Sequence, residues 1–213
     1  IHLSLHRCAP QVKSAESAPG AAGGALRVGF IPGVEPDVFA RRWYSDPTRP
    51  ELQLVPLDER APEEALACGA VDMVFARLPW NSAPRPAGPI LEREDIHAVP
   101  LWEERTVAVI AKDNPLSLSE ELTESDLGGE HQFSLEECGG PQGAVATVAA
   151  GNGYAVMPMS LARLHARKDV THRPLAEREG TRIVLAWPKS ADDDVRQEFQ
   201  GVVRGRTARS SRR

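Results

Sequence analysis

The sequence has few cysteines and no long apolar run. Its 213 residues include three cysteines, Cys8, Cys68 and Cys138, and no CxxC pair, so neither a disulfide framework nor a cysteine zinc site is indicated. A reducing cytoplasm is therefore the expected location. No run of 18 apolar residues is present, and His2, His6 and Arg7 interrupt the N-terminal stretch, so we predict neither a membrane span nor an export signal.

An excess of positive charge is also lacking. The 25 Lys and Arg are outnumbered by 30 Asp and Glu, which gives a net charge of -5 and no general attraction to nucleic acid. The last ten residues are an exception, because they carry five arginines between Arg204 and Arg213. We interpret this basic tail as a solvated chain end, with a weak interaction with phosphates as the alternative.

Motifs for nucleophilic catalysis and metal binding are missing as well. No serine lies in a G-x-S-x-G sequence, and Ser160 is interpreted as a helix cap in preference to a nucleophile. His165 and His172 have no third ligand at helical or strand spacing, and the adjacent glutamate pairs are expected on solvated helix starts and loops. We therefore predict no catalytic residue, no metal site and no enzymatic activity.

The two glycines around Asn152 do not indicate a nucleotide cofactor. Gly151 and Gly153 follow a predicted helix and precede a predicted strand, whereas a phosphate-binding loop follows a strand and opens a helix. Their expected role is the tight turn in the stretch Val145 to Met159. We predict no cofactor.

Alternating strands and helices in the first half predict an α/β fold. Short apolar runs at Leu26–Phe30, Leu52–Leu57 and Met73–Leu78 alternate with helical segments near Asp37–Tyr44 and from Pro62 to Gly69. This order implies parallel strands joined by right-handed crossovers.

The second half predicts a separate lobe. Thr106–Ala111 is continuously apolar, as expected of a strand covered on both faces, and a short strand at Ile96–Pro100 precedes it. A weak helix is expected at Leu118–Leu127, and Gly128–Gly143 is expected to be loop. Further along, we expect a helix from Leu161 to Lys168, strands at Thr171–Leu175 and Ile183–Trp187, and a last helix that docks on the first lobe with Val195, Phe199, Val202 and Val203.

From these elements we predict that the chain divides into four parts. Residues 1–25 are rich in Ala, Gly, Pro and Ser and are expected to form a flexible linker. Residues 26–100 and 188–205 are assigned to lobe I, residues 101–187 to lobe II and residues 206–213 to the basic tail.

Candidate ligand-binding residues lie where strands end, because the loops at strand ends hold the ligand in open α/β sheets. Predicted helix starts after Val34 and Met159 suit a small anion or carboxylate. Arg77 is the strongly cationic member of the set, and a salt bridge at the strand end is an equally weighted alternative for it. The set is Ile31, Pro32, Gly33, Val34, Arg77, Leu78, Pro79, Thr106, Pro158 and Met159.

The order of these segments resembles a known family. The sequences LRVGFIPG, VDMVFARLP, PLWEERTVAVIAKDNPL, VAAGNGYAVMP and RIVLAWP together resemble the effector-binding (substrate-binding) domain of LysR-type transcriptional regulators, which is similar in fold to type 2 periplasmic binding proteins. The resemblance extends from about Leu26 to Arg204.

The resemblance implies two Rossmann-like lobes joined by two crossover strands, with a small-molecule effector between them and hinges near Pro100–Arg105 and Arg173–Ala176. It also implies a homodimer that regulates transcription. The second lobe is expected to be shortened at Gly128–Gly143. Residues 1–25 contain no helix-turn-helix, so DNA contact is expected only through a missing upstream domain or a partner chain.

Several alternatives stay open at the level of sequence. The turn Ile31–Gly33 lacks the Ser or Thr that often holds an effector carboxylate in the family, so a ligand-independent module is one of them. A transport-type solute-binding protein would need an export signal. An enzyme of the same two-lobed fold, such as a dehydratase-like protein, would need a positioned acid and base.

Overall fold

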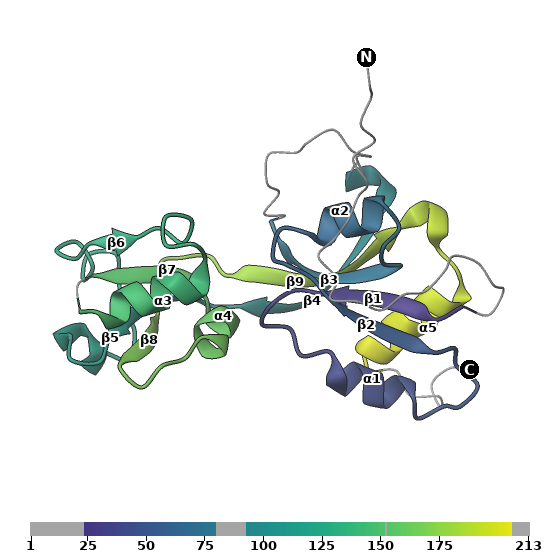
Figure 1. Ribbon diagram of the computed structural model, residues 1–213, viewed down its shortest axis with the longest axis horizontal. Coiled ribbons are helices and arrows are strands. Elements are labelled where there is room, and N and C mark those ends of the chain that lie inside the picture. Colours follow the sequence, from purple (N-terminus) through teal and green to yellow (C-terminus); the bar gives the residue numbers. More distant parts are fainter. Residues whose placement is uncertain (1–23, 80–92, 152, 206–213) are drawn as a thin grey trace, which may run out of the picture. The chain divides into compact units, whose positions relative to one another are not determined.

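The computed structural model describes residues 24–79, 93–151 and 153–205, which form two compact units (Figure 1). Unit 1 comprises the chain up to Ile31, Glu35–Leu101 and the chain from Val184 onward. Unit 2 comprises Pro32–Val34 and Trp102–Ile183. The predicted basic tail, and nearly all of the predicted linker, lie outside the described residues.

Unit 1 is built on a sheet with strand order β2-β1-β3-β9-β4. Strand β1 (Leu26–Phe30) pairs in parallel with β2 (Leu52–Pro56) and with β3 (Met73–Leu78), which confirms the predicted parallel crossovers. The other two strands, β9 (Thr181–Pro188) and β4 (Ile96–Glu104), have residues in both units. They are the two crossover strands that the family resemblance implies.

Helices cover both faces of this sheet (Figure 1). On one face, α2 (Pro62–Ala67) packs Leu66 and Ala65 against the apolar side chains of β3 and β9. On the other face, α1 (Asp37–Trp43) and α5 (Asp194–Val203) pack aromatic rings against each other and against Phe75 of β3. The ring of Phe199 lies 5.4 Å from that of Trp43 and 6.3 Å from that of Phe75. The docking of the last helix on the first lobe is thus confirmed.

The sheet of unit 2 has the order β6-β7-β5-β8. Its central strand β5 (Thr106–Ala111) pairs antiparallel with β7 (Tyr154–Pro158) and with β8 (Val170–Pro174). The short strand β6 (Gln132–Phe133) pairs in parallel with β7. Strand β5 is therefore the interior of this sheet.

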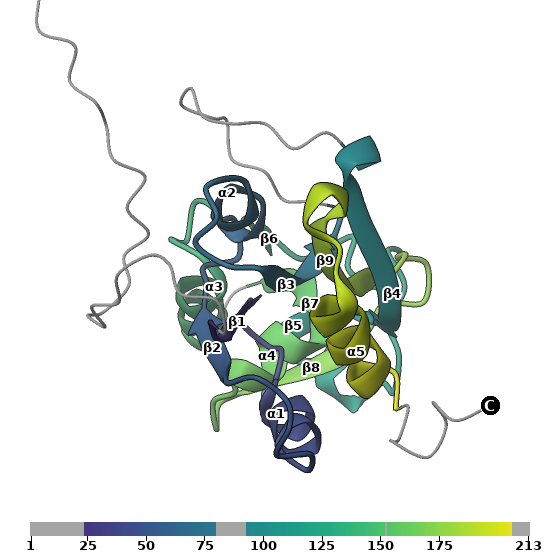
Figure 2. The same cartoon turned by 90° about the vertical axis from the view of Figure 1, so that its right-hand side faces the viewer.

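Both faces of strand β5 are covered, which explains its continuous apolar sequence. Val107 and Val109 pack against α3 (Pro141–Ala149) and α4 (Met159–Leu164) on one face. On the opposite face, Ala108 and Ile110 pack against three leucines of the following chain segment, Leu116, Leu122 and Leu127. Figure 2 shows the two helices of this unit from a second direction.

The helix predicted at Leu118–Leu127 is wrong. A 3-10 turn (Pro115–Leu118) is followed by turns, and Leu122 forms a parallel β-bridge with Leu175. The Thr123 amide and hydroxyl both donate to the Asp126 carboxylate at 2.8 Å, and this local pairing stabilises a turn in place of a helix. The predicted loop at Gly128–Gly143 contains β6 and the start of α3.

The predicted helix cap at Ser160 is also wrong. Helix α4 begins at Met159, its N-cap is Pro158, and no side chain caps it. Strand β4 extends to Glu104, four residues beyond the predicted Pro100. Two further 3-10 turns, Arg93–Asp95 and Lys189–Ala191, precede β4 and α5.

The unit boundaries fall between Leu101 and Trp102 in β4 and between Ile183 and Val184 in β9. The first boundary lies inside the predicted hinge segment Pro100–Arg105. The second predicted hinge segment, Arg173–Ala176, lies within unit 2, where β8 is paired with β5 along its whole length.

Candidate ligand-binding site

The strand ends of unit 1 carry four of the predicted ligand-binding residues. Strands β2 and β3 lie on either side of β1, so the carboxyl ends of β1 and β3 flank a topological switch point of the sheet. Ile31 follows β1 and is fully buried. Leu78 packs against the cluster beneath α2, and Pro79, which follows a cis peptide bond, is exposed.

Arg77 is the charged member of this group, and it is bound by a carboxylate of its own chain. Its side chain is 6% exposed, and its guanidinium donates to the Glu59 carboxylate, whose side chain is 25% exposed. Glu59 follows β2, so the ion pair joins segments from the two sides of β1. The structure therefore contains the salt bridge that the sequence left as an alternative for Arg77.

Unit 2 brings three predicted residues together at the ends of paired strands. Thr106 and Pro158 are partners in the register of β5 and β7. The Met159 amide donates to the Arg105 carbonyl at 2.9 Å, and the Thr106 hydroxyl donates to the Glu179 carbonyl at 2.9 Å. A hydroxyl oxygen and the first residues of α4 thus lie at one edge of the sheet.

The turn Pro32–Val34 packs with unit 2 although its neighbours in sequence belong to unit 1. Gly33 has a φ of +87°, and a Cβ placed on it would lie 2.5 Å from the Ser160 Oγ and 2.8 Å from the Ser160 Cβ. A side chain at position 33 is therefore excluded both by backbone conformation and by space.

Ser160, the second residue of α4, lies at this edge. The sequence indicates Pro158–Ser160 as one of the strand ends, although it predicts a helix cap as the role of Ser160 itself. Its contact with the turn at Gly33 joins distant parts of the chain, and no local signal in the sequence reports such a contact.

Groups with shifted pKa values lie outside the predicted set. Burial, together with the nearby cations Arg163 and Arg173, lowers the pKa of His172 on β8. Hydrogen bonds from the Gln197 and Trp187 side chains lower the pKa of Asp192 against a smaller opposing effect of desolvation. These shifts accompany structural contacts and do not identify an acid and base pair at the strand ends.

The described residues show neither a metal-binding cluster nor a membrane span. Among them, no three or more His, Cys, Asp and Glu side chains gather where they could hold a metal ion. In the same part of the chain, every helix is too short or too polar to cross a bilayer.

Comparison with known proteins identifies a family for these features. A family model described as "LysR substrate binding domain" matches residues 19–141, which is more than half of the chain, and this confirms the resemblance seen in the sequence. A search of curated protein sequences finds no match.

Solved structures share the fold at low sequence identity. A full-length BenM mutant has a TM-score of 0.65 and 19% identity, with 91% of this chain and 70% of that chain covered. The BenM effector binding domain with its effector benzoate has a TM-score of 0.64 and 20% identity, with 88% and 93% covered. A cysteine mutant of Corynebacterium glutamicum OxyR has a TM-score of 0.62 and 18% identity, with 84% of this chain covered. This chain spans 63% of the length of that protein.

Proposed function

Because the chain belongs to the LysR substrate binding domain family, we propose that it binds a small-molecule effector and thereby takes part in transcription regulation. The match of the family model to residues 19–141 carries this proposal. The fold that the chain shares with the benzoate-bound BenM effector binding domain supports it. In this role the protein binds its small molecule without transforming it.

The strand-end residues are the proposed contacts of the effector. They combine a hydroxyl at Thr106, backbone groups at the turn that contains Gly33, and apolar surface from prolines and Met159. Such a mixture of apolar lining and few polar groups is typical of small-molecule sites. In unit 1 the proposed contacts are Ile31, Arg77, Leu78 and Pro79. In unit 2 they are Pro32, Gly33, Val34, Thr106, Pro158 and Met159, together with Ser160, which lies against Gly33.

The proposal extends to the partners of the chain. The domain acts as a homodimer in the cytoplasm, and DNA is contacted by another domain or by a partner chain. Sedimentation equilibrium of the purified chain tests the dimer. A molecular mass equal to that of a single chain at every protein concentration would contradict it. Sequencing the coding region upstream of Ile1 tests for a DNA-binding domain.

The effector is sought by thermal shift with a panel of metabolites, followed by titration calorimetry of each hit. Two threonines provide a matched pair of variants, because each donates its hydroxyl to a backbone carbonyl at 2.9 Å within unit 2. Thr106→Val removes the hydroxyl at the strand end, and Thr147→Val removes one inside α3. Loss of one hydrogen bond to the ligand should weaken binding roughly 3- to 10-fold in the first variant and leave the second unchanged.

Two outcomes would count against this function. If no compound of a broad panel changes the melting temperature at millimolar concentration, the chain does not act as a small-molecule sensor. If a ligand is found and both variants bind it like the unmodified protein, the ligand does not contact Thr106 and the proposed site is elsewhere.

A further inference from the structure

Strand β2 forms one edge of the unit 1 sheet, and a tyrosine hydroxyl is bound to that edge. Within the described residues, β2 pairs with β1 on one side and has no strand on its other side (Figure 2). The Tyr44 hydroxyl donates to the Leu52 carbonyl at 2.9 Å and accepts from the Leu52 amide at 3.1 Å. From these bonds we infer that Tyr44 closes this edge against strand pairing with a second copy of the chain.

The hydrogen bonds of β1 show which backbone groups of β2 face away from it. The Leu26 amide donates to the Glu51 carbonyl at 2.7 Å. Backbone groups of successive residues in a strand point in opposite directions, so Glu51 and every second residue after it face β1. The outward-facing residues of β2 are therefore Leu52, Leu54 and Pro56.

These outward-facing residues offer little to an added strand once Tyr44 is in place. Proline has no N–H, so Pro56 can accept a hydrogen bond but cannot donate one. The amide and the carbonyl of Leu52 are both bonded to Tyr44. Leu54 is then the one outward-facing residue of β2 that can pair fully with another strand, and an added strand needs several such residues in succession.

The position of Tyr44 favours this role over a role in the core. Tyr44 follows α1 and is 56% exposed, whereas its neighbour Trp43 is fully buried. Loss of an exposed hydroxyl costs little stability, because water replaces its hydrogen bonds. The contact with Leu52 therefore matters more for what can reach β2 than for the stability of unit 1.

An edge of the unit 2 sheet is bonded by its own chain in a similar way. On β8, the His172 carbonyl accepts from the Arg173 guanidinium at 2.9 Å, and the Pro174 carbonyl accepts from the Leu122 amide at 2.9 Å. Both of these carbonyls face away from β5, because the Leu175 amide donates to β5 at Thr106. Occupied edge groups are one of the ways in which proteins prevent edge-to-edge association.

Removal of the Tyr44 hydroxyl tests the inference. Tyr44→Phe keeps the ring and removes the hydrogen-bonding group, and Tyr44→Ala removes the ring as well. The matched control is Tyr154→Phe, because Tyr154 lies on the interior strand β7 and its hydroxyl donates to the Gln132 side chain at 3.2 Å. Circular dichroism shows first that each variant is folded, and sedimentation velocity then compares the sizes of their assemblies over a range of protein concentrations.

Both Tyr44 variants should form larger assemblies than the unmodified chain does at the same concentration. The association constant of the added contact should increase at least about tenfold, because Leu52 can then exchange hydrogen bonds with the second copy. Tyr154→Phe should sediment like the unmodified chain. The inference is overturned if the two Tyr44 variants sediment like the unmodified chain as well.

Hydrogen exchange locates the contact, and its first comparison needs no substitution. In the unmodified chain, exchange of the amides in residues 52–56 should not depend on protein concentration, and in the Tyr44 variants it should slow as the concentration rises. Protection of this segment at high concentration in the unmodified chain would overturn the inference, because the edge would then already accept a second copy. Association of the variants without protection of this segment would overturn it too. These outcomes do not depend on whether an effector is found.

Discussion

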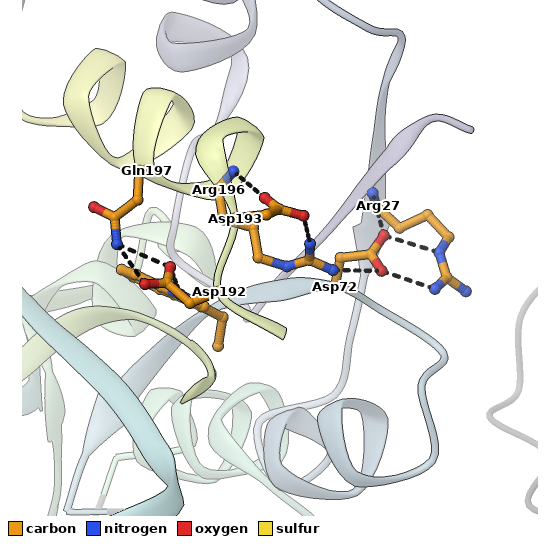
Figure 3. A network of polar contacts seen from close by, with 7 residues as sticks. Arg27, Asp72, Asp192, Asp193, Arg196 and Gln197 are labelled. Carbon is orange, nitrogen blue, oxygen red and sulfur yellow. Dashed lines mark hydrogen bonds and ion pairs between the residues drawn. The ribbon is translucent and has the colours of Figure 1, made fainter. Parts of the chain in front are cut away.

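The Arg196 guanidinium donates to the Asp72 carboxylate at 3.2 Å across 124 positions of the sequence (Figure 3). The same carboxylate accepts from the backbone amide and from the guanidinium of Arg27 at 2.9 to 3.1 Å. Asp72 precedes β3, Arg27 lies in β1 and Arg196 lies in the first turn of α5. One carboxylate therefore joins two strands of the sheet to the last helix.

Replacement of Asp72 by Asn should destabilise the protein by about 2 kcal/mol, because two partly buried guanidinium groups lose their common partner. The value allows for the 39% exposure of the Arg27 side chain, which lets water replace part of the interaction. Urea unfolding followed by circular dichroism measures the loss. The control is Asp169→Asn, which breaks the exposed pair with Arg167; a loss as large in that variant would show that Asp72 has no special role.

Gly33→Ala should destabilise the protein more than Gly69→Ala does. Both glycines have positive φ, +87° and +69°, but a Cβ at Gly69 would meet no atom within 4 Å. Alanine at Gly69 should therefore cost only the backbone term of about 1 kcal/mol, whereas the contact with Ser160 should raise the cost at Gly33 to about 2–4 kcal/mol. Thermal unfolding of both variants and of Gly33→Ala/Ser160→Gly measures the coupling, and equal losses in the two single variants would contradict the contact.

His172 should make stability depend on pH in the acidic range. Its pKa in the folded protein lies below the ordinary value of 6.5, so between these two values the unfolded chain binds more protons than the folded chain. The free energy of unfolding should accordingly fall as the pH decreases from about 6.5 toward the folded pKa, and be unaffected by this group above about pH 7.5.

The substitution His172→Gln should flatten this part of the stability profile, measured by urea unfolding between about pH 7.5 and pH 5. His165→Gln, at the end of α4, is the control. If the free energy of unfolding still depends on pH in His172→Gln, and no longer does so in His165→Gln, the effect belongs to His165 and the prediction for His172 is wrong.

Arg173 should hold the segment after β5 on the sheet. Its guanidinium donates to the backbone carbonyls of Ser119 at 2.6 Å, Ser117 at 2.5 Å and His172 at 2.9 Å. Arg173→Ala should therefore destabilise the protein by about 1 kcal/mol, because exposed and half-buried carbonyl groups lose a charged donor and water can replace part of the interaction. Hydrogen exchange should show faster exchange in residues 116–123.

Arg182→Ala provides the control for Arg173, because the ion pair of Arg182 with Glu103 is exposed on both sides and exposed pairs contribute little. Unchanged exchange rates near Leu122 in the Arg173 variant would mean that the leucine contacts alone hold this segment.

The strands that are buried on both faces were predicted to the residue. The bounds of β1, β3 and β5 agree with the runs Leu26–Phe30, Met73–Leu78 and Thr106–Ala111, because a strand covered on both sides is mostly apolar. Arg27 in β1 and Arg77 in β3 are the charged exceptions, and each is held by a carboxylate. The prediction of a helix at Leu118–Leu127 was wrong because this segment has no regular apolar pattern. Its buried leucines, Leu122 and Leu127, are five positions apart, which is not a helical spacing, and they pack against β5 and Leu175, whereas Leu118 is exposed.

Local sequence patterns predicted the two α/β halves and the parallel strands of the first half, because apolar periodicity indicates which positions are buried. The order of these segments also indicated the family. Local patterns could not identify partners. That Arg77 is neutralised by Glu59, and that Ser160 lies against Gly33, became visible only in the folded chain. Both contacts join segments that lie on different elements, and the identity of a contact across such a distance depends on how the sheets and helices pack, which no local window of sequence contains.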